Sequence, residues 1–78
     1  MSRKKEPVQE PKLYAVIRSG KRKEAFESWK YYSIVDILRD MRVPLLPAYD
    51  AAKWAGRAKD GDMKTIGDIE IRIERRLF

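Results

Sequence analysis

The 78-residue chain contains no cysteine and no histidine. Without cysteine it has no disulfide, no thiolate nucleophile and no cysteine-containing zinc site. Without histidine it lacks the usual general base at neutral pH and the commonest metal ligand. Serine-triad hydrolases, zinc hydrolases and two-histidine iron enzymes are therefore excluded. We expect a protein that is not an enzyme, with no catalytic residue, no metal and no cofactor.

Long apolar runs are also missing. Charged residues make up 38% of the chain, and no apolar run approaches the ~20 residues that a membrane-spanning helix needs. A chain of this length buries only about 60% of its unfolded surface, which predicts one small domain with a thin core. We expect no membrane partner and a cytoplasmic location, in a bacterial host cell or associated with its nucleoid.

Positive charge is concentrated at the start of the chain. Residues 1–23 hold eight Lys or Arg and two Glu, whereas residues 24–78 hold ten residues of each sign, so the net charge of +6 lies in the first part. Two clusters, Arg3-Lys4-Lys5 and Lys21-Arg22-Lys23, account for most of it. A focused positive patch attracts polyanions, and phosphate backbones are the commonest of these.

The first eleven residues contain two prolines and a single isolated valine. Such a segment buries too little apolar surface to order itself, so residues 1–11 are interpreted as a flexible basic tail. The basic run Arg3-Lys4-Lys5 is then placed to lie along a phosphate backbone or to enter a minor groove. We expect the folded domain to cover residues 12–78.

Two β-hairpins are predicted, one at each end of this domain. Alternating apolar residues indicate strands at 12–18 and 23–29, joined by a turn at Ser19-Gly20-Lys21, with Trp29 in the core. The second hairpin joins residues 63–66 to residues 69–75. Its last strand carries three isoleucines in strict alternation with charged residues, the signature of a sheet with one buried face.

Two short helices are predicted between the hairpins. Ser33 is a suitable N-cap, an apolar stripe follows it at helical spacing, and Pro44 ends the first helix by about Arg42. The second helix begins near Pro47 or Asp50 and runs to about Lys59. Its buried stripe is expected to be Ala51, Trp54, Ala55 and Ala58.

This order predicts an α+β fold: a β-hairpin, two helices resembling a helix-turn-helix, and a closing hairpin resembling the wing of a winged helix. In such modules the second helix enters the major groove. Lys53 and Arg57 stand four residues apart on its exposed face, and Ala51, Ala52 and Gly56 are small enough to allow close approach to a groove.

An ordinary α/β mini-domain with solvated charges is the alternative, since Asp60 and Asp62 would repel phosphate. The candidate nucleic-acid-binding residues are Arg3, Lys4, Lys5, Lys21, Arg22, Lys23, Lys53, Arg57 and Lys59.

Aromatic residues crowd the first hairpin and its exit. Beside a basic turn they could stack on single-stranded bases, but more often such residues form the core. We expect one of Tyr31 and Tyr32 to be exposed. Asp60, Asp62 and Asp68 flank glycines and are interpreted as turn residues rather than as cation ligands.

Two family resemblances extend this interpretation. The segment Tyr14-Ala-Val, the basic glycine-containing turn and Phe26-Glu-Ser-Trp29 resemble the opening hairpin of the RNA–DNA hybrid-binding (viroplasmin-like) domain of some ribonucleases H. That resemblance implies hybrid binding by the basic turn and nearby aromatics. The hairpin from Leu13 to Phe26, the helices from Ser33 to Lys59 and the strand from Ile69 to Glu74 are together similar to small phage-encoded proteins. This second resemblance implies an accessory or regulatory protein of a phage or mobile element.

The sequence therefore leaves several hypotheses open. The first is a non-enzymatic nucleic-acid-binding module, with duplex DNA as the expected ligand. The second is a protein-binding adaptor or inhibitor that captures an acidic host protein, using Tyr31, Tyr32 or Phe78 as anchors. A hybrid-binding hairpin is the third. A homodimer formed through the free edge of the closing strand is a further expectation.

Overall fold

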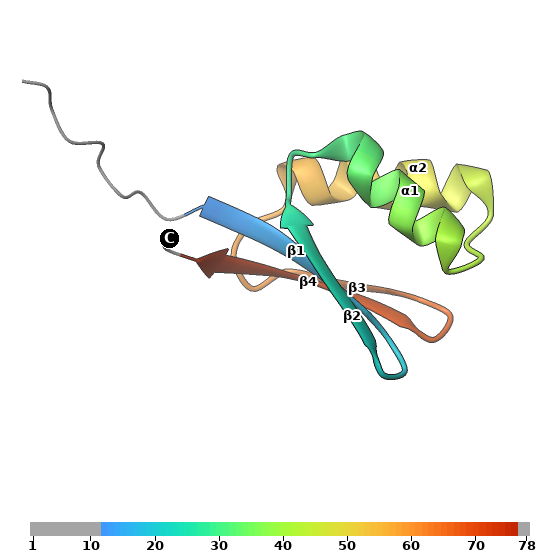
Figure 1. Cartoon of the computed structure of the whole chain (residues 1–78). Coiled ribbons are helices and arrows are strands. Elements are labelled where there is room, and N and C mark those ends of the chain that lie inside the picture. Colours follow the sequence, from blue (N-terminus) through green and yellow to red (C-terminus); the bar gives the residue numbers. More distant parts are fainter. Residues whose placement is uncertain (1–11, 77–78) are drawn as a thin grey trace, which may run out of the picture.

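The computed structural model describes residues 12–76. The expectations for Arg3, Lys4, Lys5 and Phe78 fall outside the described residues. Six elements follow one another along the chain: β1 (Lys12–Ser19), β2 (Arg22–Glu27), α1 (Tyr31–Asp40), α2 (Leu45–Arg57), β3 (Met63–Ile66) and β4 (Ile69–Arg76). The expected α+β order of hairpin, two helices and hairpin is confirmed (Figure 1).

The two hairpins join into one antiparallel sheet with the strand order β2-β1-β4-β3. β1 pairs with β4 along its whole length, from Lys12 opposite Arg76 to Ser19 opposite Ile69. The hairpin between β1 and β2 turns at Gly20-Lys21, where Gly20 supplies a φ of +62° that a two-residue turn favours. β2 ends at Glu27, two residues before the expected end at Trp29.

β4 is an interior strand, which changes where a second copy could pair. β1 occupies one of its edges and β3 the other. The residues that precede β3 continue this pairing along the same edge of β4: Gly61 N–H donates to Ile73 O, and Ile73 N–H donates to Asp62 O. The expected pairing of a second copy along the closing strand is therefore wrong in its location, and the sheet edges are β2 and β3.

The helix boundaries differ from the expected ones at all four ends, and α2 ends at Arg57 rather than at about Lys59. Ser33 lies inside α1 and is not its N-cap, because the turn after β2 leads into the helix through Lys30, without a side-chain cap. α1 ends at Asp40, and Arg42 adopts a left-handed φ of 72° while Val43 N–H donates to Leu38 O. α2 begins directly after Pro44. Pro47 then falls in its first turn, where a missing N–H costs nothing.

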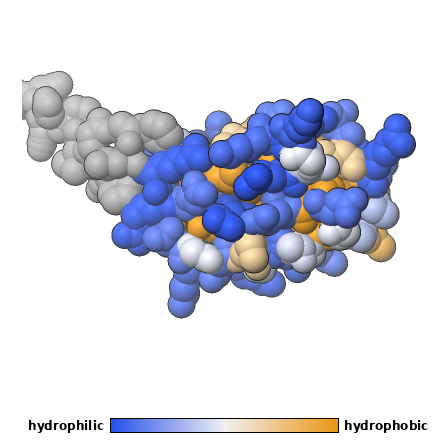
Figure 2. Space-filling model, turned by 90° about the horizontal axis from the view of Figure 1, so that it is seen from below, coloured by the Kyte–Doolittle hydropathy of each residue, from blue (hydrophilic) through white to orange (hydrophobic). Residues whose placement is uncertain are grey.

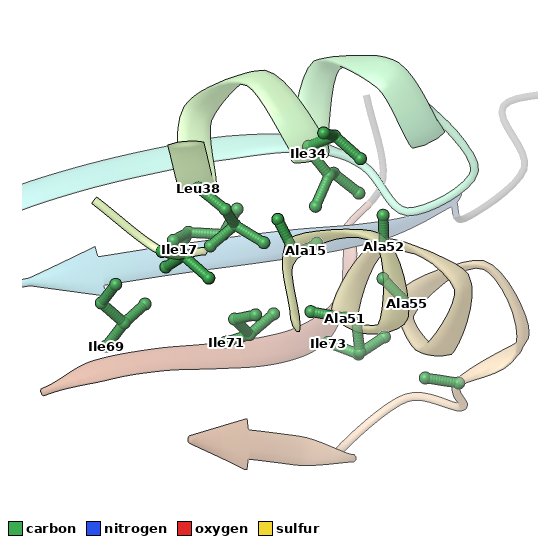
Figure 3. Packing of buried hydrophobic residues seen from close by; sticks show 14 residues of the cluster. Ala15, Ile17, Ile34, Leu38, Ala51, Ala52, Ala55, Ile69, Ile71 and Ile73 are labelled. Atoms are coloured by element: carbon green, nitrogen blue, oxygen red, sulfur yellow. The ribbon is translucent and has the colours of Figure 1, made fainter. Parts of the chain in front are cut away.

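The helices cover one face of the sheet, and the core lies between the two layers (Figures 1 and 3). Its largest fully buried side chains come from β1, α1 and β4: Ile17, Ile34, Leu38, Ile71 and Ile73. α2 contributes only alanines, namely Ala48, Ala51, Ala52 and Ala55. Because these side chains are small, the backbone of α2 approaches that of α1 closely. The expected role of Ala51 and Ala52 at a groove is therefore wrong, since both are buried.

The opposite face of the sheet is not covered by any element of the described chain. Register places Lys23, Arg18 and Glu70 in one row across three strands, and Ala25, Val16 and Arg72 in the next. Seen from this side the molecule is mainly hydrophilic, with apolar groups between the charged ones (Figure 2). The same alternation that buries the isoleucines of β4 therefore builds a charged outer face.

The burial of the α2 alanines predicts that substitutions at two neighbouring positions change the free energy of unfolding by very different amounts. Ala52→Leu inserts three carbons into a packed interface and should lower the free energy of unfolding by about 1–3 kcal/mol. Lys53→Leu, one residue further along on the exposed side, should change it by less than about 0.5 kcal/mol. Urea unfolding followed by circular dichroism measures both. Equal stability of the two variants would contradict the packing of α2 described above.

Candidate functional site

Most cations on the open sheet face are neutralised within the sheet. Glu27 accepts ion pairs from Lys12 at 3.4 Å and from Lys30 at 3.7 Å. Glu70 pairs with Arg72 at 2.9 Å, and Glu74 pairs with Arg76 at 3.3 Å. These carboxylates leave little net positive charge on the outer face of the sheet away from the β1–β2 turn. The unpaired positive charge must therefore be sought elsewhere.

The turn between β1 and β2, called the tip below, carries the Lys21-Arg22-Lys23 cluster, and its three cations have different surroundings. Arg22 points towards the helices and forms an ion pair of 2.8 Å with Asp40 and one of 3.3 Å with Glu24. The hydrogen bond to Asp40, followed by that to Glu24, raises the pKa of the Arg22 guanidinium. Lys21 and Lys23 are exposed and have no carboxylate partner among residues 12–76. Two of the three expected cations therefore remain available at the tip.

Arg18 is a third available cation at the tip, which the sequence analysis did not include. It lies directly opposite Lys23 in the β1–β2 register, and its other neighbour, Glu70, is held by Arg72. Like charges directly opposite each other destabilise a sheet. The symmetry of the turn could have revealed it, because residues equally distant from Gly20-Lys21 face each other.

The exposed side of α2 carries the second group of cations. Lys53 and Arg57 are exposed and four residues apart, as expected, and neither has a carboxylate partner in the described part of the chain. Lys59 follows the helix, and its backbone N–H donates to Asp62 Oδ2 at 2.8 Å while its side chain is exposed. Trp54, expected in the buried stripe, packs against the core but is only half-buried, with the Lys64 ammonium 5.8 Å from its ring centroid.

The two groups of cations are not brought together. The tip lies at one end of β2, and the chain enters α1 above the last turns of α2 at the other end (Figure 1). Six residues of strand separate the tip from that end of β2, a length of about 20 Å. A ligand that touches both groups must therefore be extended.

The aspartates near the end of α2 act as turn residues, as expected. Asp60 Oδ1 accepts a hydrogen bond from Arg75 N–H at 3.0 Å, and Asp62 accepts from Lys59 N–H. They tie the connection between α2 and β3 to β4. Within residues 12–76 no three acidic side chains lie close enough to hold a metal ion.

Trp29 was expected in the core, and this expectation is wrong. Its side chain is 64% exposed. Trp29 follows the end of β2 and lies in the turn in which Lys30 N–H donates to Glu27 O. The alternation of the strand therefore does not continue to Trp29, and the expected strand bounds misplaced it. Tyr32 is 76% exposed whereas Tyr31 is half-buried, so the expectation of one exposed tyrosine is confirmed.

Comparison with known proteins finds no matching family, no similar curated protein and no similar solved structure. The resemblances to phage-encoded proteins and to hybrid-binding domains therefore stay predictions. Among the described residues, neither helix is long and apolar enough to cross a membrane.

The cation pair at the tip predicts a gain in stability when one charge is reversed. Lys23→Glu replaces a like-charge pair with Arg18 by an opposite-charge pair and should raise the free energy of unfolding by roughly 0.2–1 kcal/mol. Lys21→Glu, in the turn itself, has no residue directly opposite and should change it less. Thermal unfolding at low salt compares the two variants. A loss of stability in Lys23→Glu would contradict the proximity of the two charges.

Proposed function

We propose that this chain is a non-enzymatic DNA-binding module of the cytoplasm whose principal ligand is duplex DNA. The observation that carries the proposal is the separation of its charges. Carboxylates neutralise cations along the sheet, whereas Arg18, Lys21 and Lys23 at the tip and Lys53 and Arg57 on the exposed side of α2 have no such partner. Carboxylates repel a phosphate backbone, and unpaired Lys and Arg attract one.

The tip is suited to phosphate contacts. Arg18, Lys21 and Lys23 lie at the turn end of the β1–β2 hairpin, and none has an acidic partner of its own in the described structure. A cross-strand pair of cations that costs stability in the free protein is relieved when an anion binds between them. Such contacts position a protein on DNA without reading its sequence.

α2 is suited to base-edge contacts. Its outward stripe presents Lys53 and Arg57, and Gly56 beside them adds no side chain. A helix of 13 residues fits the major groove, where Arg and Lys donate to guanine. Because its alanines are buried in the core, this stripe faces solvent.

The first test of this function is the dependence of binding on salt. Affinity for a mixed-sequence duplex should fall linearly on a log–log plot, with a slope of about −0.9 for each phosphate neutralised. Three to six contacts then correspond to slopes between about −3 and −5. Fluorescence anisotropy of a labelled duplex measures it. Undetectable binding at low salt would reject the proposed function.

Charge reversal at the two groups of cations should give different results. Lys21→Glu with Lys23→Glu should weaken all sequences alike, because phosphate contacts carry no sequence information. Lys53→Glu with Arg57→Glu should instead abolish any preference between sequences. Arg22 is left intact in both, so the ion pair with Asp40 survives. Wild-type binding by both double variants would show that neither group contacts DNA.

A protein-binding adaptor is the second candidate function, favoured by one observation. Leu45 and Leu46 are 45% and 71% exposed and lie between Pro44 and Pro47 at the start of α2. Exposed apolar residues grouped in this way mark interaction sites. A partner that stays bound after nuclease treatment would favour this candidate, and a partner lost with the nucleic acid would favour DNA binding.

A further inference from the structure

The end of β2, the start of α1 and the last turns of α2 meet on one side of the molecule (Figure 1). A Cβ added at Gly56 would lie 3.9 Å from Ser28 O, so α2 passes directly beside the β2–α1 turn. The ring of Tyr31 stacks on that of Tyr49 with centroids 6.0 Å apart and planes 13° apart. Removal of water from the Tyr31 phenol, together with the nearby Tyr49, Tyr32 and Asp50, raises its pKa. This contact fixes the start of α1 against α2.

Two exposed aromatic rings border this junction. Trp29 lies in the turn itself and Tyr32 in the first turn of α1, with 64% and 76% of their surfaces exposed. The Tyr32 ring stands edge-on to Tyr31, at 5.0 Å and 84°, so its orientation is set by the fixed stack. Large aromatic rings are usually buried, and rings held in the open at a basic surface are typical of stacking platforms.

Basic residues lie near these rings. Lys53 follows Tyr49 by one helical turn, so it lies on the side of α2 that meets the start of α1. The Lys30 ammonium lies 5.3 Å from the Trp29 ring centroid and also pairs with Glu27. Lys53 has no acidic partner in the described structure.

We propose that this surface binds an unpaired segment of a DNA strand, with one base stacked on Trp29 and a second at Tyr32. This inference rests on the proposed DNA-binding function and deepens it. In a duplex both faces of each base are already stacked, and freeing one costs a few kcal/mol. An exposed indole therefore selects strands whose bases are already free. The preferred DNA then combines a duplex, held by the tip and α2, with a single-stranded end.

The test compares a ten-nucleotide oligothymidine with a duplex of mixed sequence by fluorescence anisotropy, using the full chain. Trp29→Ala should weaken binding of the single strand by roughly 5- to 150-fold, the effect of removing one stacked base. Duplex binding should change less than about threefold. Trp29→Phe should restore most of the single-strand affinity, because a smaller ring still stacks. Leu46→Ala, exposed at the other end of α2, is the control and should change neither affinity.

A spectroscopic measurement separates stacking from a general loss of charge contacts or fold. In a Trp54→Phe background, Trp29 is the remaining indole, and oligothymidine should quench its emission at stoichiometric amounts. A Trp29→Phe protein, which retains Trp54, should show little quenching. Trp29 emission that does not change while the strand is bound would overturn the stacking proposal.

The outcomes distinguish this inference from the function on which it rests. If wild-type protein binds neither DNA at low salt, the proposed function fails. If it binds the duplex, and Trp29→Ala leaves single-strand binding unchanged, only the stacking surface is rejected. Tighter, Trp29-dependent binding of an oligouridine than of the oligothymidine would overturn the assignment to DNA.

Discussion

Full-length antiparallel pairing of β1 with β4 is the constraint on which the rest of the structure depends. It joins two hairpins that are distant in sequence into one sheet, and its register determines the face on which every strand residue lies. Ile17 opposite Ile71 and Ala15 opposite Ile73 form the floor of the core. A shift of one residue would bury the carboxylates and arginines of β4 and expose its isoleucines.

The same register separates paired from unpaired charge. On the outer face Glu70 and Glu74 stand within reach of Arg72 and Arg76, so the closing strand neutralises itself. Near the tip of the first hairpin, Arg18 faces Lys23 instead. Because the helices need the inner face, this charged outer face and its tip remain open to solvent. The candidate surfaces thus follow from how the core is built rather than from the basic clusters alone.

Regular patterns in the sequence predicted the elements well. The alternating isoleucines of β4 and the helical stripe that includes Ile34 and Leu38 both indicated the correct secondary structure. Helix boundaries were harder to predict, since α1 begins two residues before Ser33, without a side-chain cap, and α2 begins two residues before Pro47. Expectations for single side chains failed where contacts outside the local pattern decide the outcome. Arg22 is paired with Asp40 from α1, and Trp29 lies in the turn that follows β2.

The most direct test of the account is an amide-resolved NMR titration of the full chain with a duplex that carries a single-stranded end. The central claim is that cations lacking carboxylate partners form the DNA-binding surface. The account predicts chemical-shift changes concentrated at residues 18–23, at residues 29–32 and at residues 53–59, with few changes at residues 70–76. Changes confined to Leu45 and Leu46, or centred on the ion-paired outer face of β4, would contradict it.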